Sequence, residues 1–236
     1  MRSEEAETLA AWILGLKLKP GAVCLNIGSS TKRFREVDQP HIYEQFIAPL
    51  EASGIRFIHC DMKEAEGVDE VGDVLDPDFR SRLQGYRADV LVCSNLLEHL
   101  TKPKEFARAC GELVRDGGYG LFSVPLSYPY HPDPIDTMFR PRPEDLAAML
   151  PGWRPIEARV LEVGTYWEDL RKSGMPIQGL VRRLARAALP FYRPKKWRTN
   201  ASRLAWLFRP YRLSLVLLSK PCNADSGREA ASGNRT

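Results

Sequence analysis

Residues 88–100 read A-D-V-L-V-C-S-N-L-L-E-H-L, and this stretch decides the fold class. The run from Ala88 to Cys93 is apolar on both faces, which is typical of a parallel strand covered on both sides. Polar residues follow at once, beginning with Ser94, so the strand ends where a loop begins. The stretch therefore predicts a central parallel strand with a functional loop at its carboxyl end.

Further strand-like segments occur on both sides of this strand, with helical periodicity between them. Strands are expected at 22–27, 55–60, within 70–75, at 119–124, 159–163 and 213–218. Helices are expected at 4–16, 41–50, 104–114 and 143–150. Residues 116–118 are expected to end the third of these helices, and Pro125 to end the strand at 119–124. The alternation predicts a Rossmann-like, doubly wound α/β sheet, mostly parallel with an antiparallel last strand, in a single domain over residues 1–220.

Composition places the chain among globular proteins, because 44% of its 236 residues are hydrophobic and 27% are charged. No apolar run reaches the ~18 residues of a membrane span. Glu4, Glu5 and Glu7 precede the first apolar segment, which is unlike a signal peptide. The five cysteines lack paired metal or redox spacing. Four of them have apolar neighbours, so we expect buried free thiols and a cytoplasmic protein.

Positive charge is concentrated near the end of the chain. Residues 171–220 contain 13 Lys and Arg and no Asp or Glu, and they overlap a basic amphipathic insertion at about 165–212. Its centre, Pro176 to Pro190, has an amphipathic helical pattern, and aromatic residues follow it. This predicts that 171–212 docks peripherally on an anionic membrane surface at the inner face of the membrane. Packing on its own domain is the alternative, nucleic acid is disfavoured, and residues 221–236 are expected to be a disordered tail.

Small and acidic residues follow the first three strands. Gly28 has no Cβ, so backbone and ligand can approach closely there, and Ser29 and Ser30 add hydroxyl and N–H donors. The loop lacks the further glycines of the dinucleotide fingerprint. Asp61 ends the second strand, where a carboxylate can accept hydrogen bonds from a ribose diol, and Asp73 ends the third. An ordinary tight turn and solvated strand-end acids are the structural alternatives.

Five sequence runs together resemble the class I S-adenosylmethionine-dependent methyltransferases. They are I-G-S-S at 27–30, H-C-D at 59–61, V-G-D at 71–73, the run at 88–100, and R-D-G-G-Y-G-L-F-S-V-P at 115–125. The likeness covers roughly residues 20–165 and is nearest the bacterial type 11-like group that includes ubiquinone-pathway-type enzymes. It implies S-adenosyl-L-methionine as cofactor. The family's first loop usually has two or three glycines, and this loop has Ser29, Ser30 and Lys32 instead.

The resemblance also implies the cofactor contacts. They are Asn26, Gly28, Ser29 and Ser30 at the methionine end; Asp61, Met62, Asp73 and Val74 at the ribose and adenine; and Ser94, Asn95 and Leu96 at the sulfonium and methyl. No metal is expected. The predicted activity is methyl transfer to a small-molecule, sugar or lipid-linked acceptor. The altered loop keeps a second hypothesis open, that of a non-catalytic binding or regulatory module with the same fold.

The run at 127–140, S-Y-P-Y-H-P-D-P-I-D-T-M-F-R, follows the fifth strand and suits recognition of a bulky acceptor. Candidate acceptor contacts are Tyr128, Tyr130, Asp133 and Arg140. His131 is the candidate general base for a hydroxyl acceptor, and His99 is the second candidate. Glu98 is expected to cap the next element. A structural loop packed on the sheet edge is the alternative interpretation.

Overall fold

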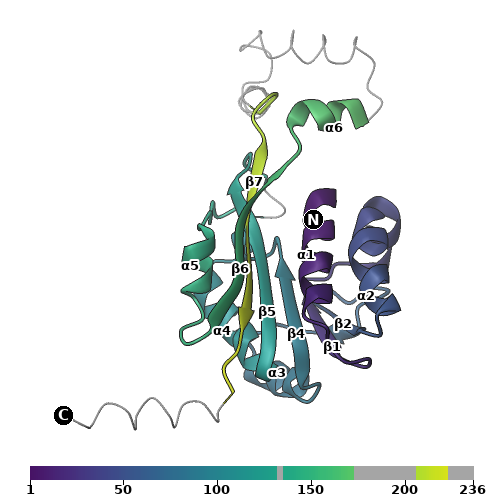
Figure 1. Ribbon diagram of the computed structural model, residues 1–236, viewed down its shortest axis with the longest axis vertical. Helices are drawn as coiled ribbons and strands as arrows, with labels where there is room; N and C mark the ends of the chain where they lie inside the picture. Colours follow the sequence, from purple (N-terminus) through teal and green to yellow (C-terminus); the bar gives the residue numbers. More distant parts are fainter. Residues whose placement is uncertain (132–134, 173–205, 223–236) are drawn as a thin grey trace, which may run out of the picture.

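A seven-stranded sheet with the strand order β3-β2-β1-β4-β5-β7-β6 forms the centre of the structure (Figure 1). The computed structural model describes residues 1–131, 135–172 and 206–222. The strands are β1 (Val23–Ile27), β2 (Arg56–Asp61), β3 (Glu70–Val71), β4 (Ala88–Ser94), β5 (Val114–Ser127), β6 (Arg154–Val163) and β7 (Tyr211–Ser219). All strand pairs are parallel except those of β7, which runs antiparallel to β5 and β6. The predicted fold class is therefore confirmed.

Helices cover both faces of the sheet (Figure 1). They are α1 (Ser3–Gly15), η1 (Phe34–Asp38), η2 (Tyr43–Ile47), α2 (Ala48–Ala52), α3 (Pro77–Gln84), η3 (Leu97–His99), α4 (Pro103–Leu113), α5 (Pro143–Ala147) and α6 (Tyr166–Lys172). One face carries α1, η2 and α2, and the other carries α3, α4 and α5. The predictions made for the helix at 176–190, for Asp133 and for the tail from 223 lie outside the described residues.

The hydrophobic core has two parts because β4 is buried on both sides. Leu91 and Cys93 belong to the cluster that includes α3 and α4, whereas Val90 and Val92 belong to the cluster that includes α1 and α2. All four side chains have no exposed surface. Alternate residues of a strand point to opposite faces, so a strand buried on both faces needs apolar residues throughout. This explains the apolar run that predicted the fold.

The boundaries of β5 differ from the prediction at both ends. The strand begins at Val114, directly after α4, and residues 116–118 lie inside it. Pro125 also lies inside the strand and pairs with Leu213 of β7, and the register shifts between Pro125 and Ser127. A proline has no N–H to give to the ladder, and such an irregularity is where a strand tolerates one. Neither Gly117 nor Pro125 therefore acts as a stop signal.

Two other elements differ from their predicted form. The helix expected at 41–50 contains the π-helical turn η2, in which the Ala48 N–H bonds to the carbonyl of Tyr43. Pro49 follows, and because it has no N–H it cannot continue an α-helical ladder at that point. The strand β3 has two residues only. At the adjoining Gly72 a Cβ would lie 2.4 Å from the ring of Phe79, so α3 packs against the backbone there.

Two further sequence features concern thiols and membrane spans. Cys24, Cys60, Cys93 and Cys110 are buried free thiols, as predicted, and Cys222 is exposed. In the part of the chain that the structure describes, no helix combines the length and the apolar character needed to cross a membrane.

A neutral histidine links β1 to β2. His59 and Asn26 face each other in the register of the two strands, and Asn26 Nδ2 lies 3.1 Å from His59 Nδ1. The ring also stacks on Phe57, with 5.6 Å between the ring centroids. Burial, together with the nearby charge of Arg35, lowers the pKa of His59 to about 4, although Asp69 opposes the shift. The folded protein therefore holds His59 neutral.

We predict that His59 makes the protein acid-labile. Its pKa is lower in the folded state than the ~6.5 of an unfolded chain, so its contribution is complete above pH 6.5 and is lost as the pH falls toward 4. The loss is on the order of 3 kcal/mol. Urea unfolding of wild type and His59→Gln at several pH values measures it. The variant should lose less stability over this window, and an identical slope in both proteins would contradict the assignment.

Candidate functional site

The loop after β1 and the carboxyl end of β2 are joined by hydrogen bonds. The Gly28 and Ser29 N–H groups donate to the carbonyl of Cys60, at 2.9 and 3.0 Å. The Ser30 N–H donates to Asp61 Oδ2 at 2.8 Å. Asp61 Oδ1 accepts a further bond from the Lys63 N–H at 3.1 Å. The two predicted cofactor segments therefore lie side by side at the carboxyl edge of the sheet.

Gly28 is also the point where the β4 loop approaches the β1 loop. Its φ of +73° lies in the left-handed region that favours glycine. A Cβ on Gly28 would lie 2.8 Å from Leu96 Cδ2. Because Leu96 follows β4, this contact brings the segments after the neighbouring strands β1 and β4 together. A side chain at position 28 would separate them.

Arg35 holds the β1 loop from inside, which the sequence analysis missed. The residue is 4% exposed, and its Nη1 donates to the carbonyls of Ser29 and Ser30 at 3.0 and 2.6 Å. Its Nη2 donates to the carbonyl of Gly67 at 2.7 Å. The guanidinium fixes a loop that has one glycine where the family usually has two or three. In the run K-R-F-R nothing in the sequence distinguishes this buried arginine from a solvated one.

The other cofactor candidates have varied surroundings. Asp73 Oδ1 accepts from the Leu75 N–H at 2.9 Å, and the side chain of Val74 is buried. Met62 is 68% exposed, and Asn26 points to His59. All of these residues lie on or next to β1, β2 or β3. Their contacts with a cofactor stay predictions.

Glu5 of α1 is a fully buried carboxylate beside the end of β4 and the neighbouring residue Ser123 of β5. It accepts hydrogen bonds from the Ser94 Oγ at 2.9 Å and from the Asn95 Nδ2 at 2.8 and 3.0 Å. The Ser123 hydroxyl and the Arg2 N–H, the latter at 3.0 Å, also donate to it. The sequence analysis treated Glu5 as one of three leading acids and missed this role. The predicted methyl-side residues Ser94 and Asn95 are thus held from the amino-terminal helix.

A cavity of about 470 Å³ opens beside Glu5. It is lined by residues 1–5, Phe34, Gln39, His41, Asn95, Glu98, His99, Pro125, Tyr128, His131, Asp169 and Leu213. Of the predicted residues, the lining includes Asn95, His99, Tyr128 and His131. The segment 28–30, Asp61 and Asp73 lie outside the lining. Arg2 bonds to Asp169 of α6 at 2.7 Å, which ties α1 to the segment after β6.

The residues after β5 place His131 on the wall of this cavity. Asp136 is buried and accepts bonds from the His131 N–H at 3.1 Å and from Arg140 Nη2 at 2.7 Å. Arg140, which is predicted to contact the methyl acceptor, therefore pairs with Asp136 of the same loop. Tyr130 is 55% exposed, whereas Tyr128 packs on Tyr211 with ring centroids 4.6 Å apart.

Glu98 does not cap the next element, contrary to the prediction. The N-cap of α4 is Lys102, and the Glu98 side chain has no exposed surface. Within the described residues neither of its carboxylate oxygens has a hydrogen-bond partner. Burial raises the pKa of Glu98 to about 8. The strand-end turn η3 directs this carboxyl group into the interior next to His99, whose Nε2 lies 3.7 Å from Glu98 Oε1.

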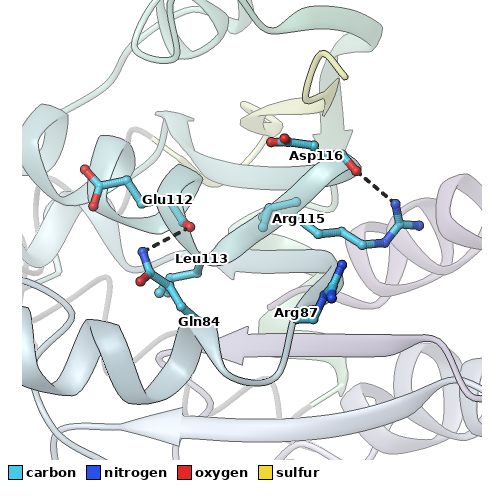
Figure 2. A pocket seen from close by; sticks show the side chains of 7 residues that line it. Gln84, Arg87, Glu112, Leu113, Arg115 and Asp116 are labelled. Atoms are coloured by element: carbon cyan, nitrogen blue, oxygen red, sulfur yellow. Dashed lines mark hydrogen bonds between the residues drawn. The ribbon is translucent and has the colours of Figure 1, made fainter. Parts of the chain in front are cut away.

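A second pocket, of about 400 Å³, lies at the opposite end of the sheet (Figure 2). Its lining includes Arg87, which precedes β4, and Val114, which begins β5. It is therefore at the amino ends of these strands. Ligands of open α/β sheets bind at the carboxyl ends, so we place the candidate site at the cavity beside Glu5.

No protein-family model matches the chain, and no curated protein sequence matches it. Solved structures, however, match the fold of this chain. A candidate methyltransferase of Bacillus halodurans C-125 is 15% identical, with 90% of this chain and 98% of that one covered at a TM-score of 0.50. Coclaurine N-methyltransferase, bound to N-methylheliamine and SAH, is 12% identical, with 90% and 70% covered at 0.51. The fold is that of the class I methyltransferases.

The class I fold also includes a different activity among these neighbours. The cyclase SpnF is 12% identical, with 92% of this chain and 82% of that one covered at a TM-score of 0.55. Identities this low show the fold alone, since one fold hosts many functions. The activity must therefore be argued from the site, and the type 11-like subgroup stays a prediction.

We predict that Glu5→Ala destabilises the protein by about 2–4 kcal/mol, because it leaves the Ser94, Asn95 and Ser123 donors without their acceptor in a buried place. Glu7→Ala, on the exposed side of the same helix, is the matched control and should change stability by less than about 0.5 kcal/mol. Urea unfolding at neutral pH measures both. Equal small effects would mean that the buried contacts of Glu5 do not hold α1.

Proposed function

We propose that this protein transfers a methyl group from S-adenosyl-L-methionine to an acceptor bound in the cavity beside Glu5. The observation that carries the proposal is the convergence of three strand ends. Ser30 of the β1 loop bonds to Asp61 of β2, and Leu96 after β4 packs on Gly28. These are the positions where the resemblance puts the methionine, the ribose and the methyl. Asn95, beside Leu96, lines the cavity and so connects the two halves of the site.

Methyl transfer requires the protein to align the methyl donor with the acceptor more than to activate the methyl group. An acceptor atom uses a lone pair to bond the methyl carbon, the carbon–sulfur bond breaks, and its electron pair stays on sulfur as the neutral thioether. The sulfonium is already a good leaving group, so the protein contributes by holding donor and acceptor in line. An oxygen acceptor must also lose its proton. His131 and His99 are the groups proposed for the acceptor side, because both imidazoles line the cavity.

The acceptor class is proposed as a small-molecule, sugar or lipid-linked compound. The volume of about 470 Å³ is within the range of small-ligand sites. The ring of Tyr128 forms an aromatic part of the cavity wall. Tyr130, two residues further along the chain, has an exposed side chain. Aromatic surface with a few polar groups is the usual composition of such sites.

We predict that wild type binds S-adenosyl-L-methionine with micromolar affinity and that Asp61→Ala weakens this binding ten- to a hundredfold. Loss of charge-assisted hydrogen bonds to the ribose corresponds to about 1.5–3 kcal/mol. Isothermal titration calorimetry measures the affinity, with Glu144→Ala as a control that removes an exposed carboxylate from α5. Wild-type affinity in folded Asp61→Ala would remove Asp61 from the site.

The non-catalytic module is the other outcome of the same titration. A folded wild-type protein that gives no heat with S-adenosyl-L-methionine or with its demethylated product would support that alternative. The altered loop motivates it, but Arg35 holds this loop in place through the carbonyls of Ser29 and Ser30.

We also propose that the basic segment, 171–212, meets an anionic membrane surface. In its described part, Phe208 is 77% exposed. Its ring centroid lies 6.5 Å from that of Trp167, which precedes the segment in α6 and is 37% exposed. Arg209 follows Phe208 in the chain, and its guanidinium lies 4.7 Å from the centroid of the Trp206 ring. Aromatic rings among basic residues are typical of interfacial segments. α6 follows β6 at the carboxyl end of the sheet, above the strands in Figure 1.

Vesicle flotation should show binding that rises with the content of phosphatidylglycerol and falls only partly in high salt. Salt screens the charges, but it leaves the insertion of apolar rings. Phe208→Ser should reduce the salt-resistant fraction. Arg154→Gln removes an exposed arginine from the far end of β6 and should leave flotation unchanged. Equal flotation of the Phe208 variant and wild type, or no flotation at all, would overturn the docking proposal.

A further inference from the structure

We propose that Glu98, His99 and His131 form a binding site for a divalent first-row transition-metal ion on the wall of the cavity. The sequence analysis expects no metal. The fold nevertheless brings them together, with one ligand atom of each residue lying within 4.8 Å of the other two. All three line the same cavity.

The first observation is the buried carboxylate of Glu98. Both of its oxygens are inaccessible to solvent and lack a hydrogen-bond partner among the described residues. Leaving a buried polar group without a partner is unfavourable, so native proteins rarely do so without a reason. A cation between Glu98 and the two imidazoles provides the missing partner.

The second observation is the orientation of the two imidazoles. His99 Nδ1 faces the carbonyl oxygen of Ile135. His131 Nδ1 lies 3.2 Å from the carbonyl oxygen of Pro129 and 3.3 Å from Asp136 Oδ2. These neighbours are all acceptors, so each Nδ1 carries the proton and each Nε2 keeps its lone pair. Metal-binding histidines commonly have this arrangement, in which the second nitrogen donates to a carbonyl or carboxylate.

The separation of the groups suits an ion with little rearrangement. His99 Nε2 is 3.7 Å from Glu98 Oε1. Two ligands that each lie ~2.1 Å from a metal are about 3.0–3.4 Å apart in octahedral or tetrahedral geometry. The rings of His99 and His131 are in an edge-to-face arrangement with centroids 5.4 Å apart. One ligand atom of each residue already lies within 4.8 Å of the other two, so small side-chain movements are sufficient.

The ligand types select the class of metal. Two imidazole nitrogens and one carboxylate oxygen suit Zn²⁺, Mn²⁺, Fe²⁺ or a similar ion. Mg²⁺ and Ca²⁺ prefer sites built from oxygen atoms. A site with three protein ligands leaves positions open toward the cavity. An acceptor hydroxyl that coordinates there would lose its proton to solvent more easily, which favours oxygen acceptors. With the metal bound, both Nε2 lone pairs are ligands, so His131 and His99 serve as proton acceptors only in the metal-free site. The role of the metal rests on the proposed methyl transfer, but the existence of the site does not.

The test is calorimetric titration of chelator-treated, full-length protein with Zn²⁺ and, separately, with Mg²⁺, both without S-adenosyl-L-methionine. We expect one tight Zn²⁺ per chain and at least hundredfold weaker Mg²⁺ binding. Glu98→Gln and His131→Gln should each weaken Zn²⁺ at least tenfold. His41→Gln is the matched control, because His41 lines the same cavity but its Nε2 is 2.9 Å from the carbonyl of Met1. It should bind Zn²⁺ as wild type does.

Thermal unfolding separates loss of the site from loss of the fold. Zn²⁺ should raise the Tm of wild type and of His41→Gln, since a ligand that binds the folded state stabilises it. It should not raise the Tm of a cooperatively unfolding Glu98→Gln. Wild-type Zn²⁺ affinity in both Glu98→Gln and His131→Gln, or no binding by wild type, overturns the metal site. Cofactor titrations run separately, so either proposal can fail while the other stands.

Discussion

The buried carboxylate of Glu5 is the constraint on which the site depends. It joins the first turn of α1 to the end of β4, through Ser94 and Asn95, and to β5, through Ser123. The positions of these three donors relative to each other are set by the pairing of β4 with β5, where Ser94 faces Ser123. One acceptor therefore fixes the loop that leads to the cavity. Without α1 these donors would have no acceptor and would face solvent. The cavity would also lose the part of its wall that residues 1–5 form.

The antiparallel strand β7 has a comparable role on the other side. It lies between β5 and β6, so its partners enclose it on both edges. Tyr211 at its start packs on Tyr128 and under the guanidinium of Arg2, which is 5.3 Å from the ring. The cavity is thus bounded by segments from the beginning, middle and end of the chain. Such a site forms only when the sheet is complete.

The candidate chemistry has two halves with different physical character. The β1 and β2 loops offer backbone N–H groups and the carboxylate of Asp61, which suit a polar cofactor. The cavity side offers imidazoles, an aromatic ring and the buried Glu98. Asn95 and Leu96 lie at the boundary, because one lines the cavity and the other covers Gly28. A reaction between a bound donor and a bound acceptor needs this kind of boundary.

The sequence by itself determined the elements whose signal is local. The apolar run of β4 fixes a strand buried on both faces, Gly28 marks a point of close approach after a strand, and Asp61 ends a strand. The strand alternation then fixes a parallel sheet and the edge at which ligands bind. The stop signal at Pro125 was misleading, because pairing with β7 outweighs the local preference there. The one at 116–118 was misleading because these residues stay within β5, at a shift in its register with β4.

Only the tertiary structure decided which charged residues are buried and what they meet. Glu5, Arg35 and Glu98 look like ordinary surface charges in the sequence, yet they are 0%, 4% and 0% exposed. Their partners are up to 118 residues away along the chain, as Ser123 is from Glu5. Periodicity and propensity report on neighbours within a few residues, whereas desolvation and hydrogen bonding depend on all atoms that surround a group in space. The metal-binding cluster follows the same rule, because His131 meets Glu98 only after β5 has paired with β4.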